Sequence, residues 1–294
     1  LQSWYLIKEE LGRMKEDYIP YTRFQEICHQ HGLGNPTEQR SLISFLHDLG
    51  AVLNFWEKRS ILMETTVINP EWITGCIYAI LNSKQLSNNG GILTAYDLEN
   101  ILDPVRYPQH KHGFILELLN YFELCFPLPE NINCYLIPDL LPKEESIPSL
   151  PTEKLNFQYQ YNFLPVSIFS RLVVRMQRYV RQKELWRTGG VFFNDEIRAL
   201  VRADIEAKKI DITVYDGDSD RRHEFLNQIC QTFRELHTTS IFGRLDVKEM
   251  IPLPDNPSIT VPYQYLQILK AIGEKTFVPI GFNEKVSVQA LLDG

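Results

Sequence analysis

Residues 46–72 constrain the fold of the first half most strongly, because they contain the end of a helix, two β-rich segments and the start of another helix. The first part predicts a helix whose apolar face is formed by Leu42, Phe45, Leu46 and Leu49. Asn35-Pro36 is a suitable start for this helix, and Gly50 is a suitable end.

Two β-rich segments follow this helix, at residues 51–56 and 61–68. The charged tripeptide Glu57-Lys58-Arg59 between them favours a hairpin loop. Asn69-Pro70 then repeats the capping pattern and predicts another helix up to about residue 83. Helix, hairpin and helix in this order indicate a winged-helix-like unit.

The same order of patterns recurs over residues 91–137. Thr94 and Asp97 form a suitable capping pair for a short helix, and a second apolar helix precedes strands near 124–126 and 135–137. We therefore predict two winged-helix-like units in tandem in a mainly helical first half.

The segment 142–151 contains three prolines and a run of charges, which disfavour both a helix and a central strand. We place the domain boundary in this segment. The predicted organisation is a first domain at 1–141, a linker at 142–153 and a second domain at 154–294.

The second domain begins with a strand in which apolar and polar residues alternate strictly from Leu155 to Phe163. One buried and one wet face are typical of an antiparallel sheet. Further strands are predicted at 190–194, 197–205 and 209–215, with a helix at about 167–181 and a long helix after Ser219 or Asp220. The expected class is mixed α and β (α+β), with helices packed on an antiparallel sheet in this half.

Charge and cysteine content narrow the possible partners and location. Residues 1–141 hold 10 Lys+Arg against 17 Asp+Glu, and this acidic excess opposes binding to nucleic acid. No apolar run is long enough to span a membrane and no signal peptide opens the chain. Five cysteines without a C-x-x-C pair fit free thiols, so a cytoplasmic protein is expected.

The sequence gives no positive evidence for a catalytic, nucleotide or metal site in this chain. The glycine-rich phosphate-binding pattern of a GTPase is absent, since Thr188-Gly189-Gly190 lacks the following lysine. The pairs His29/His31 and His110/His112 have spacing that does not suit zinc, and exposed histidines are the ordinary alternative. The acidic run 216–220 departs from a calcium loop and is better explained as a helix cap.

A basic flank is predicted on the helix 167–181, where arginines recur at helical spacing: Arg171, Arg175, Arg178 and Arg181. This flank is either a solvated helix face or a docking surface for an acidic partner or a membrane headgroup. The sequence leaves both interpretations open.

The run Leu46-His47-Asp48-Leu49-Gly50-Ala51-Val52-Leu53, followed by Val67-Ile68-Asn69-Pro70-Glu71-Trp72-Ile73, resembles the COR ("C-terminal of Roc") domain of Roco proteins. The expected source is a bacterial or other prokaryotic-type Roco protein. The resemblance extends over the whole chain. It implies a non-enzymatic module that docks on an adjacent Ras-like Roc GTPase domain. It also implies a homodimer through residues 154–294 that regulates GTP hydrolysis, with GTP or GDP and Mg²⁺ bound only by the Roc domain.

The resemblance also points to candidate contacts with the Roc domain. In leucine-rich-repeat kinases, an aromatic residue two before a proline packs on the GTPase domain, and alignment on Pro165 places Phe163 there. The kinases have tyrosine at this position, so Phe163 lacks its hydroxyl group. The hydroxyl of the nearby Tyr161 could take its place. Candidate interface residues are therefore Tyr161, Phe163, Leu164 and Pro165. The alternative is that Phe163 merely ends a core strand.

Two other functions stay open at this point. Tandem winged-helix-like units are also typical of nucleic-acid-binding proteins, although the acidic first half opposes this. The other possible function is that of an enzyme with its own small-molecule pocket.

Overall fold

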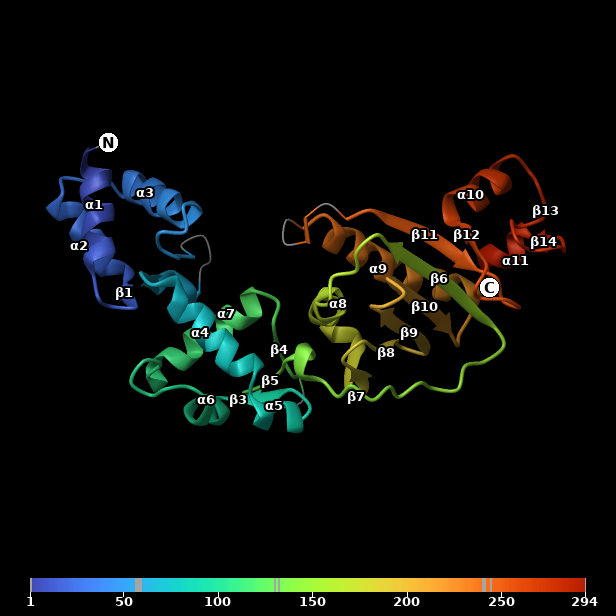
Figure 1. Ribbon diagram of the computed structural model, residues 1–294, viewed down its shortest axis with the longest axis horizontal. Helices are drawn as coiled ribbons and strands as arrows, with labels where there is room; N and C mark the ends of the chain where they lie inside the picture. The colour runs from blue at the N-terminus through green and yellow to red at the C-terminus, as the bar shows by residue number, and fades with distance from the viewer. Residues whose placement is uncertain are drawn as a thin grey trace. The chain divides into compact units, whose positions relative to one another are not determined.

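The computed structural model (Figure 1) describes residues 2–55, 60–129, 131, 133–239, 242–243 and 245–293. The chain divides into two compact units, 1–135 and 136–294. Helices and antiparallel strand pairs occur in both units, so the predicted mixed α and β class is confirmed. The division falls within strand β5, whereas the sequence analysis placed the boundary in the linker that follows it.

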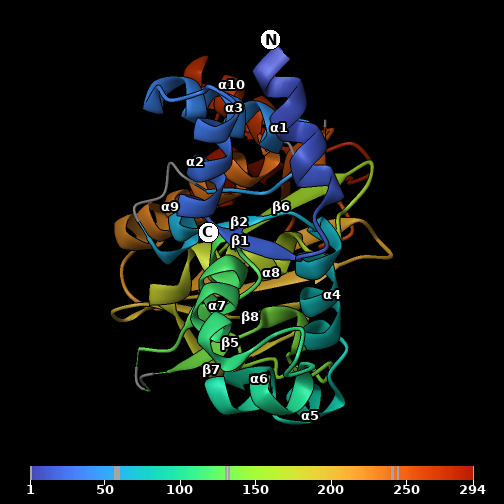
Figure 2. The same ribbon diagram turned by 90° about the vertical axis from the view of Figure 1, so that its left-hand side faces the viewer.

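The first half of unit 1 contains three helices packed around one apolar core. Its elements are α1 (Gln2–Arg13), β1 (Tyr18–Pro20), α2 (Tyr21–Gln30), α3 (Pro36–Asp48), a 3₁₀ turn (Ile61–Glu64) and β2 (Thr65–Val67). Strands β1 and β2 pair antiparallel and lie side by side in Figure 2. Asn35 caps α3 as expected, since its side chain accepts a hydrogen bond from Thr37 N at 2.8 Å.

The second half of unit 1 repeats this order of elements. It contains α4 (Pro70–Leu81), α5 (Lys84–Asn88), β3 (Ile92–Thr94), α6 (Ala95–Ile101), α7 (His112–Tyr121), β4 (Phe126–Pro127) and β5 (Cys134–Leu136). The first strand again pairs with the last, because the sheet order is β3-β5-β4. The capping box of Thr94 and Asp97 opens α6 as predicted. The repeated order of elements is thus observed, while the winged-helix interpretation stays a prediction.

The predicted hairpin of the first repeat is largely wrong. Its loop, residues 57–59, lies outside the described residues, and the first strand is reduced to a single bridge between Leu53 and Val67. Residues 61–64 form a 3₁₀ turn instead of a strand, because the Ser60 side chain accepts a hydrogen bond from Leu62 N and caps the turn. The longer partner of β2 is β1, from the other end of the repeat.

The buried face of α3 also differs from the predicted one. Leu42 and Leu46 are buried together with Ile43, whereas Phe45 and Leu49 are 47% and 55% exposed. The Phe45 ring is partly covered by Trp4 of α1, at 5.6 Å between ring centroids. The apolar surface of this helix is therefore wider than its core face.

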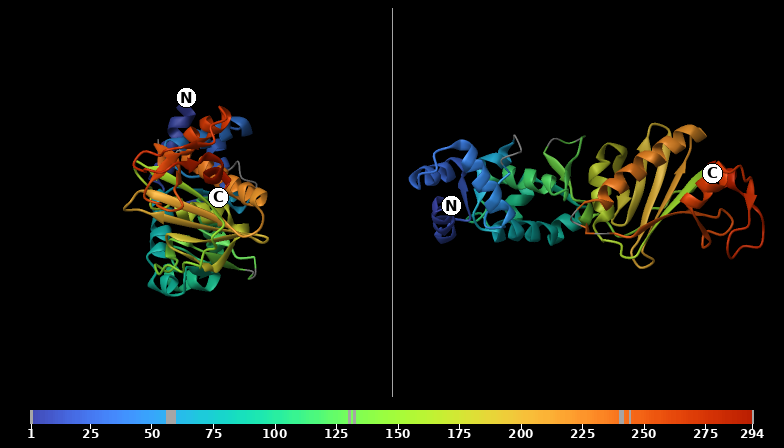
Figure 3. Two further views of the ribbon diagram at one scale, coloured as in Figure 1. Left: turned by 90° about the vertical axis from the view of Figure 1, so that its right-hand side faces the viewer. Right: turned by 90° about the horizontal axis from the view of Figure 1, so that it is seen from above.

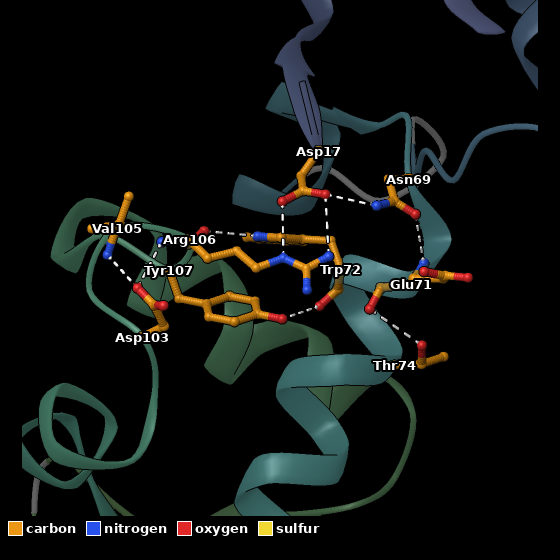
Figure 4. A network of polar contacts seen from close by, with 9 residues as sticks. All are labelled: Asp17, Asn69, Glu71, Trp72, Thr74, Asp103, Val105, Arg106 and Tyr107. Carbon is orange, nitrogen blue, oxygen red and sulfur yellow. Dashed lines mark hydrogen bonds and ion pairs between the residues drawn. The ribbon is translucent and has the colours of Figure 1, made fainter. Parts of the chain in front are cut away.

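A polar network joins the two repeats within unit 1 (Figure 4). The Arg106 guanidinium donates to both carboxylate oxygens of Asp17, at 3.0 and 3.3 Å, and Asp17 also accepts from Asn69 Nδ2 at 2.7 Å. The indole N–H of Trp72 donates to Arg106 O, and Tyr107 Oη donates to Trp72 O, both at 2.9 Å. The loop after α6 is therefore fixed to the start of α4 and to the segment before β1.

Unit 2 is built on an antiparallel sheet. In its described residues the sheet has seven strands in the order β12-β11-β6-β10-β9-β8-β7. The strands are β6 (Lys154–Tyr161), β7 (Val180–Trp186), β8 (Gly189–Asn194), β9 (Ile197–Asp204), β10 (Lys209–Tyr215), β11 (Val247–Pro252) and β12 (Thr260–Pro262). Three of the predicted strands correspond to β8, β9 and β10.

Helices α8 (Ile168–Arg175) and α9 (Ser219–His237) pack on this sheet, as Figure 3 shows. The predicted apolar stripe of α9 is buried; it consists of Phe225, Ile229, Phe233 and Leu236. A C-terminal group completes the unit, with α10 (Tyr263–Ala271), β13 (Thr276–Phe277), β14 (Val286–Ser287) and α11 (Val288–Asp293).

The proline-rich segment 142–151 lacks regular secondary structure, as expected, but it is fixed to unit 2. Arg187 N donates to Pro142 O at 2.7 Å, and Arg202 pairs with Glu145 at 2.8 Å. Leu150 packs on a small apolar cluster that contains Trp186 and Leu200. The segment therefore covers part of the sheet.

The predicted helix 167–181 is too long. α8 ends at Arg175, residues 177–179 form a 3₁₀ turn, and residues 180–186 form the edge strand β7. Gln182, Lys183 and Glu184 favour a helix locally, but the residues on either side of them, Val180, Leu185 and Trp186, pair with β8, and Trp186 is buried. The exposed charges Arg181 and Lys183 suit a sheet edge.

Candidate docking site

The loop 162–167 connects the end of β6 to α8. Asn162 Oδ1 accepts a hydrogen bond from Phe163 N at 2.7 Å, and Asn162 N donates to Asp246 O at 3.2 Å. Ile168 N then donates to Pro165 O at 3.1 Å at the start of the helix. These backbone contacts fix the direction in which each side chain of the loop points.

The loop presents two apolar side chains to solvent. Phe163 is 62% exposed and Val166 is 72% exposed, whereas Leu164 is only 2% exposed and Pro165 is buried. Phe163 therefore does not end a core strand, which was the alternative considered from the sequence. Two exposed apolar side chains held on one fixed loop are a suitable contact surface for another protein.

A groove of about 600 Å³ lies beside these side chains. Phe163, Pro165 and Val166 line it from the loop. Its other lining residues come from separate elements and include Asp139, Arg187, Thr188 and Phe242. The groove thus combines apolar walls with one acidic and one basic side chain.

The polar side chains of this groove are held by neighbours. Asp139 accepts a hydrogen bond from the Ser170 hydroxyl of α8. Arg187 Nε donates to Leu141 O at 3.2 Å. These contacts orient both groups before any partner arrives, which lowers the entropy cost of binding.

Two of the predicted interface residues are unsuitable as surface contacts. Tyr161 is 7% exposed, and its hydroxyl is hydrogen-bonded to His237 Nε2 of α9 at 2.9 Å. Burial lowers the pKa of His237 to about 4, with a smaller effect from Arg234. Tyr161 and Leu164 therefore support the loop from inside, and the Tyr161 hydroxyl is already engaged by His237.

The predicted basic flank is not a single helical face. Only Arg171 and Arg175 lie on α8, whereas Arg178 is in the 3₁₀ turn and Arg181 is in β7. The Arg181 guanidinium lies over the Phe193 ring, at 4.2 Å from its centroid. Arg171 lies over Phe242 beside the docking groove, at 5.8 Å.

One histidine of each pair has an ordinary structural partner. His31 Nε2 contacts Glu10 at 2.6 Å, and the buried His112 contacts Tyr107 O at 3.1 Å. Within the described ranges, no three His, Cys, Asp or Glu side chains lie close enough to hold a metal ion.

The acidic run 216–220 caps a helix, as predicted, but the capping residue is Asp218. Its side chain accepts a hydrogen bond from Arg221 N at 3.0 Å at the start of α9. The sequence analysis placed the cap one or two residues later. The run therefore has a structural role.

Sequence comparisons identify the class of protein to which this fold and loop belong. Residues 2–141 match the family "C-terminal of Roc, COR-A domain", and residues 152–294 match "C-terminal of Roc, COR-B domain". The two matches together cover most of the chain. The chain therefore belongs to the COR family of Roco proteins.

Its relatives include much longer proteins. The chain is 29% identical over 227 residues to the probable serine/threonine-protein kinase pats1 of Dictyostelium discoideum. This match covers 72% of this chain and 7% of that protein. It is 24% identical over 214 residues to mouse leucine-rich repeat serine/threonine-protein kinase 1, covering 69% of this chain and 10% of that protein. The chain thus spans a small part of these relatives, and they do not support the predicted prokaryotic type.

Solved structures of related proteins also match this chain in part. The structure of Methanosarcina barkeri Roco2 RocCORdC bound to GDP is 34% identical and covers 48% of this chain and 44% of its own, with a TM-score of 0.43. Among the described residues, no helix is both long and apolar enough to cross a membrane.

Proposed function

We propose that this chain is the dimerisation and coupling module of a Roco GTPase. It docks on the adjacent Roc domain through the loop 162–167 and pairs two protomers, so that GTP hydrolysis in one Roc domain depends on the other. The module itself is not an enzyme and binds no cofactor, and GTP or GDP and Mg²⁺ bind to the Roc domain.

The observation that carries the docking proposal is the exposure of Phe163 beside a preformed groove. Aromatic side chains that enter a partner's pocket provide much of the binding energy of protein interfaces. Leu164 and Pro165 take part by supporting the loop and lining the groove. The acidic excess of residues 1–141 favours a protein partner over a nucleic acid.

A cytoplasmic location is part of the same proposal. The five cysteines are buried free thiols, which fit a reducing compartment. Burial raises the pKa of Cys28 and Cys230 to about 11, so neither is a reactive thiolate at neutral pH.

The docking test compares Phe163→Ala with Tyr96→Ala, a control that removes another exposed aromatic ring, from α6. Each variant is titrated with the Roc domain of the same polypeptide, loaded with GDP and Mg²⁺, and each melting temperature is measured. Phe163→Ala should weaken binding about tenfold or more, with little change in melting temperature. A large fall in melting temperature with unchanged binding would rule out the interface role.

The pairing test is sedimentation velocity of this chain over a wide range of concentrations. A tight dimer is expected, since an interface of about 2,000 Å² or more gives stable association. A monomer at every concentration would assign the pairing to the Roc domain and would contradict this half of the proposal.

A further inference from the structure

A second groove in unit 2 is lined by basic and amide side chains. It has a volume of about 530 Å³ and lies where α8 and the following 3₁₀ turn meet α9. Arg175 and Arg178 line it from α8 and the turn, and Arg234 lines it from α9. This groove shares no lining residue with the groove beside Phe163.

The groove offers hydrogen-bond donors and positive charge. Besides the three arginines, α9 contributes the amides of Asn227, Gln228 and Gln231. No carboxylate is among the described lining residues, although the chain as a whole has a net charge of −7. Guanidinium groups and amides together match ligands that carry several carboxylate or phosphoryl oxygens.

Two of the arginines are held in place but keep room for a ligand. The Arg178 guanidinium lies over the Tyr179 ring, at 4.7 Å from its centroid, and a stacked guanidinium keeps its N–H edge available. Arg234 Nη2 lies 3.5 Å from Glu249 Oε1, a long contact, and its side chain is 51% exposed. Neighbouring acids therefore take little of the positive charge of Arg178 and Arg234.

We propose that this groove binds an acidic segment of a partner protein, with Arg178 and Arg234 as its main contacts and Arg175 contributing charge. The ligand oxygens are carboxylates or phosphoryl groups on an extended chain. The Arg178 and Arg234 side chains would contact such a chain from the turn and from α9. The proposal is independent of Roc docking at Phe163.

A peptide fits this groove better than the other polyanions. A membrane presents a broad surface, which cannot enter a groove of about 530 Å³ as a single extended chain can. Nucleic acid binding requires a long line of phosphate contacts, whereas three arginines are among the described lining residues of this groove. A single acidic segment needs only a few charge-assisted hydrogen bonds.

The test is fluorescence anisotropy of the whole chain with a short labelled peptide of alternating Glu and Ser, its phosphoserine form, and a version with Gln in place of Glu. Saturable, salt-sensitive binding of an acidic peptide is expected, without binding of the Gln peptide. Arg178→Gln and Arg234→Gln should each lower the affinity about tenfold. The matched control is Arg198→Gln, because Arg198 is similarly exposed at 52% and paired with Asp216, but lies outside the groove.

Several outcomes would overturn the proposal. One is that neither acidic peptide binds at concentrations up to millimolar. Another is that Arg198→Gln loses as much affinity as Arg178→Gln and Arg234→Gln. Tighter binding of duplex DNA or of phosphatidylserine vesicles that is lost in the same two variants would assign the groove to a different class of ligand. Melting temperatures of all variants show whether a lost signal reflects unfolding.

Discussion

Tyr161 is the last residue of strand β6 and Phe163 stands two residues further on, yet their surroundings are opposite. Tyr161 is 7% exposed and its hydroxyl contacts His237, whereas Phe163 is 62% exposed. Strand alternation would place both on one face, but β6 ends at Tyr161 and the turn at Asn162 redirects the chain. One aromatic side chain therefore stabilises unit 2, and the other is available to a partner.

The difference shows how a docking loop can be both exposed and well ordered. The buried side chains on either side of Phe163, Tyr161 and Leu164, anchor the loop in the core. The exposed ring then loses little conformational freedom on binding. Variants that separate stability from binding test this division.

The largest effect is expected for Tyr161→Ala. Removing a buried aromatic ring should lower the free energy of unfolding by about 3–5 kcal/mol. Phe163→Ala should lower it by less than about 0.5 kcal/mol, because an exposed ring makes few core contacts. Urea denaturation of both variants, followed by circular dichroism, measures the two values. Similar losses in both would contradict the distinction between the two rings.

A smaller effect is expected from the pH dependence of His237. Its pKa in the folded chain is about 4, below the ordinary value of 6.5, so the unfolded chain binds the proton more readily. The stabilisation by neutral His237 is complete above pH 6.5 and is lost as the pH falls from 6.5 to 4. Allowing for partial exposure, we expect a loss of about 1–2 kcal/mol.

The control for this pH effect is His237→Gln, which retains a hydrogen-bonding group beside Tyr161. The difference in unfolding free energy between wild type and this variant should change over this pH range. A difference that stays constant from pH 7 to pH 4 would contradict the role of His237.

The smallest effect is expected for Arg106→Gln in unit 1. The Arg106 and Asp17 side chains are 41% and 24% exposed, so their ion pair is screened by solvent, unlike the buried contact of Tyr161. We expect a loss of about 0.5–1 kcal/mol, which diminishes at high salt. Thermal unfolding at low and high salt measures it, and a loss of the size expected for Tyr161→Ala would contradict this ranking.

The sequence predicts those elements whose local pattern agrees with their tertiary packing. Strict alternation in β6, the apolar stripe of α9 and the caps at Asn35 and Thr94 could all be recognised. Strand β7 could not, because Gln182, Lys183 and Glu184 favour a helix, and the segment is a strand through the pairing of its flanking residues with β8. The 3₁₀ turn after Ser60 likewise depends on one side-chain cap.

The candidate docking site was predicted only in part. Alignment on Pro165 identified the loop, but the pattern could not show that Tyr161 is buried and Phe163 exposed, since that depends on where β6 ends. Val166 and Asp139 were missed, because nothing in their local sequence distinguishes them. Arg234 of the basic groove could have been found, since it lies outside the apolar stripe of α9.

The most direct test of the central claim replaces Phe163 with the photoreactive residue benzoylphenylalanine, which keeps an aromatic ring at this position. Tyr96 is replaced in the same way as a control, because it is similarly exposed at 70%. After irradiation with the GDP-loaded Roc domain, mass spectrometry identifies the crosslinked peptides. Crosslinks to the Roc domain from position 163 and not from position 96 are predicted, and crosslinks from position 96 alone would contradict docking through the loop 162–167.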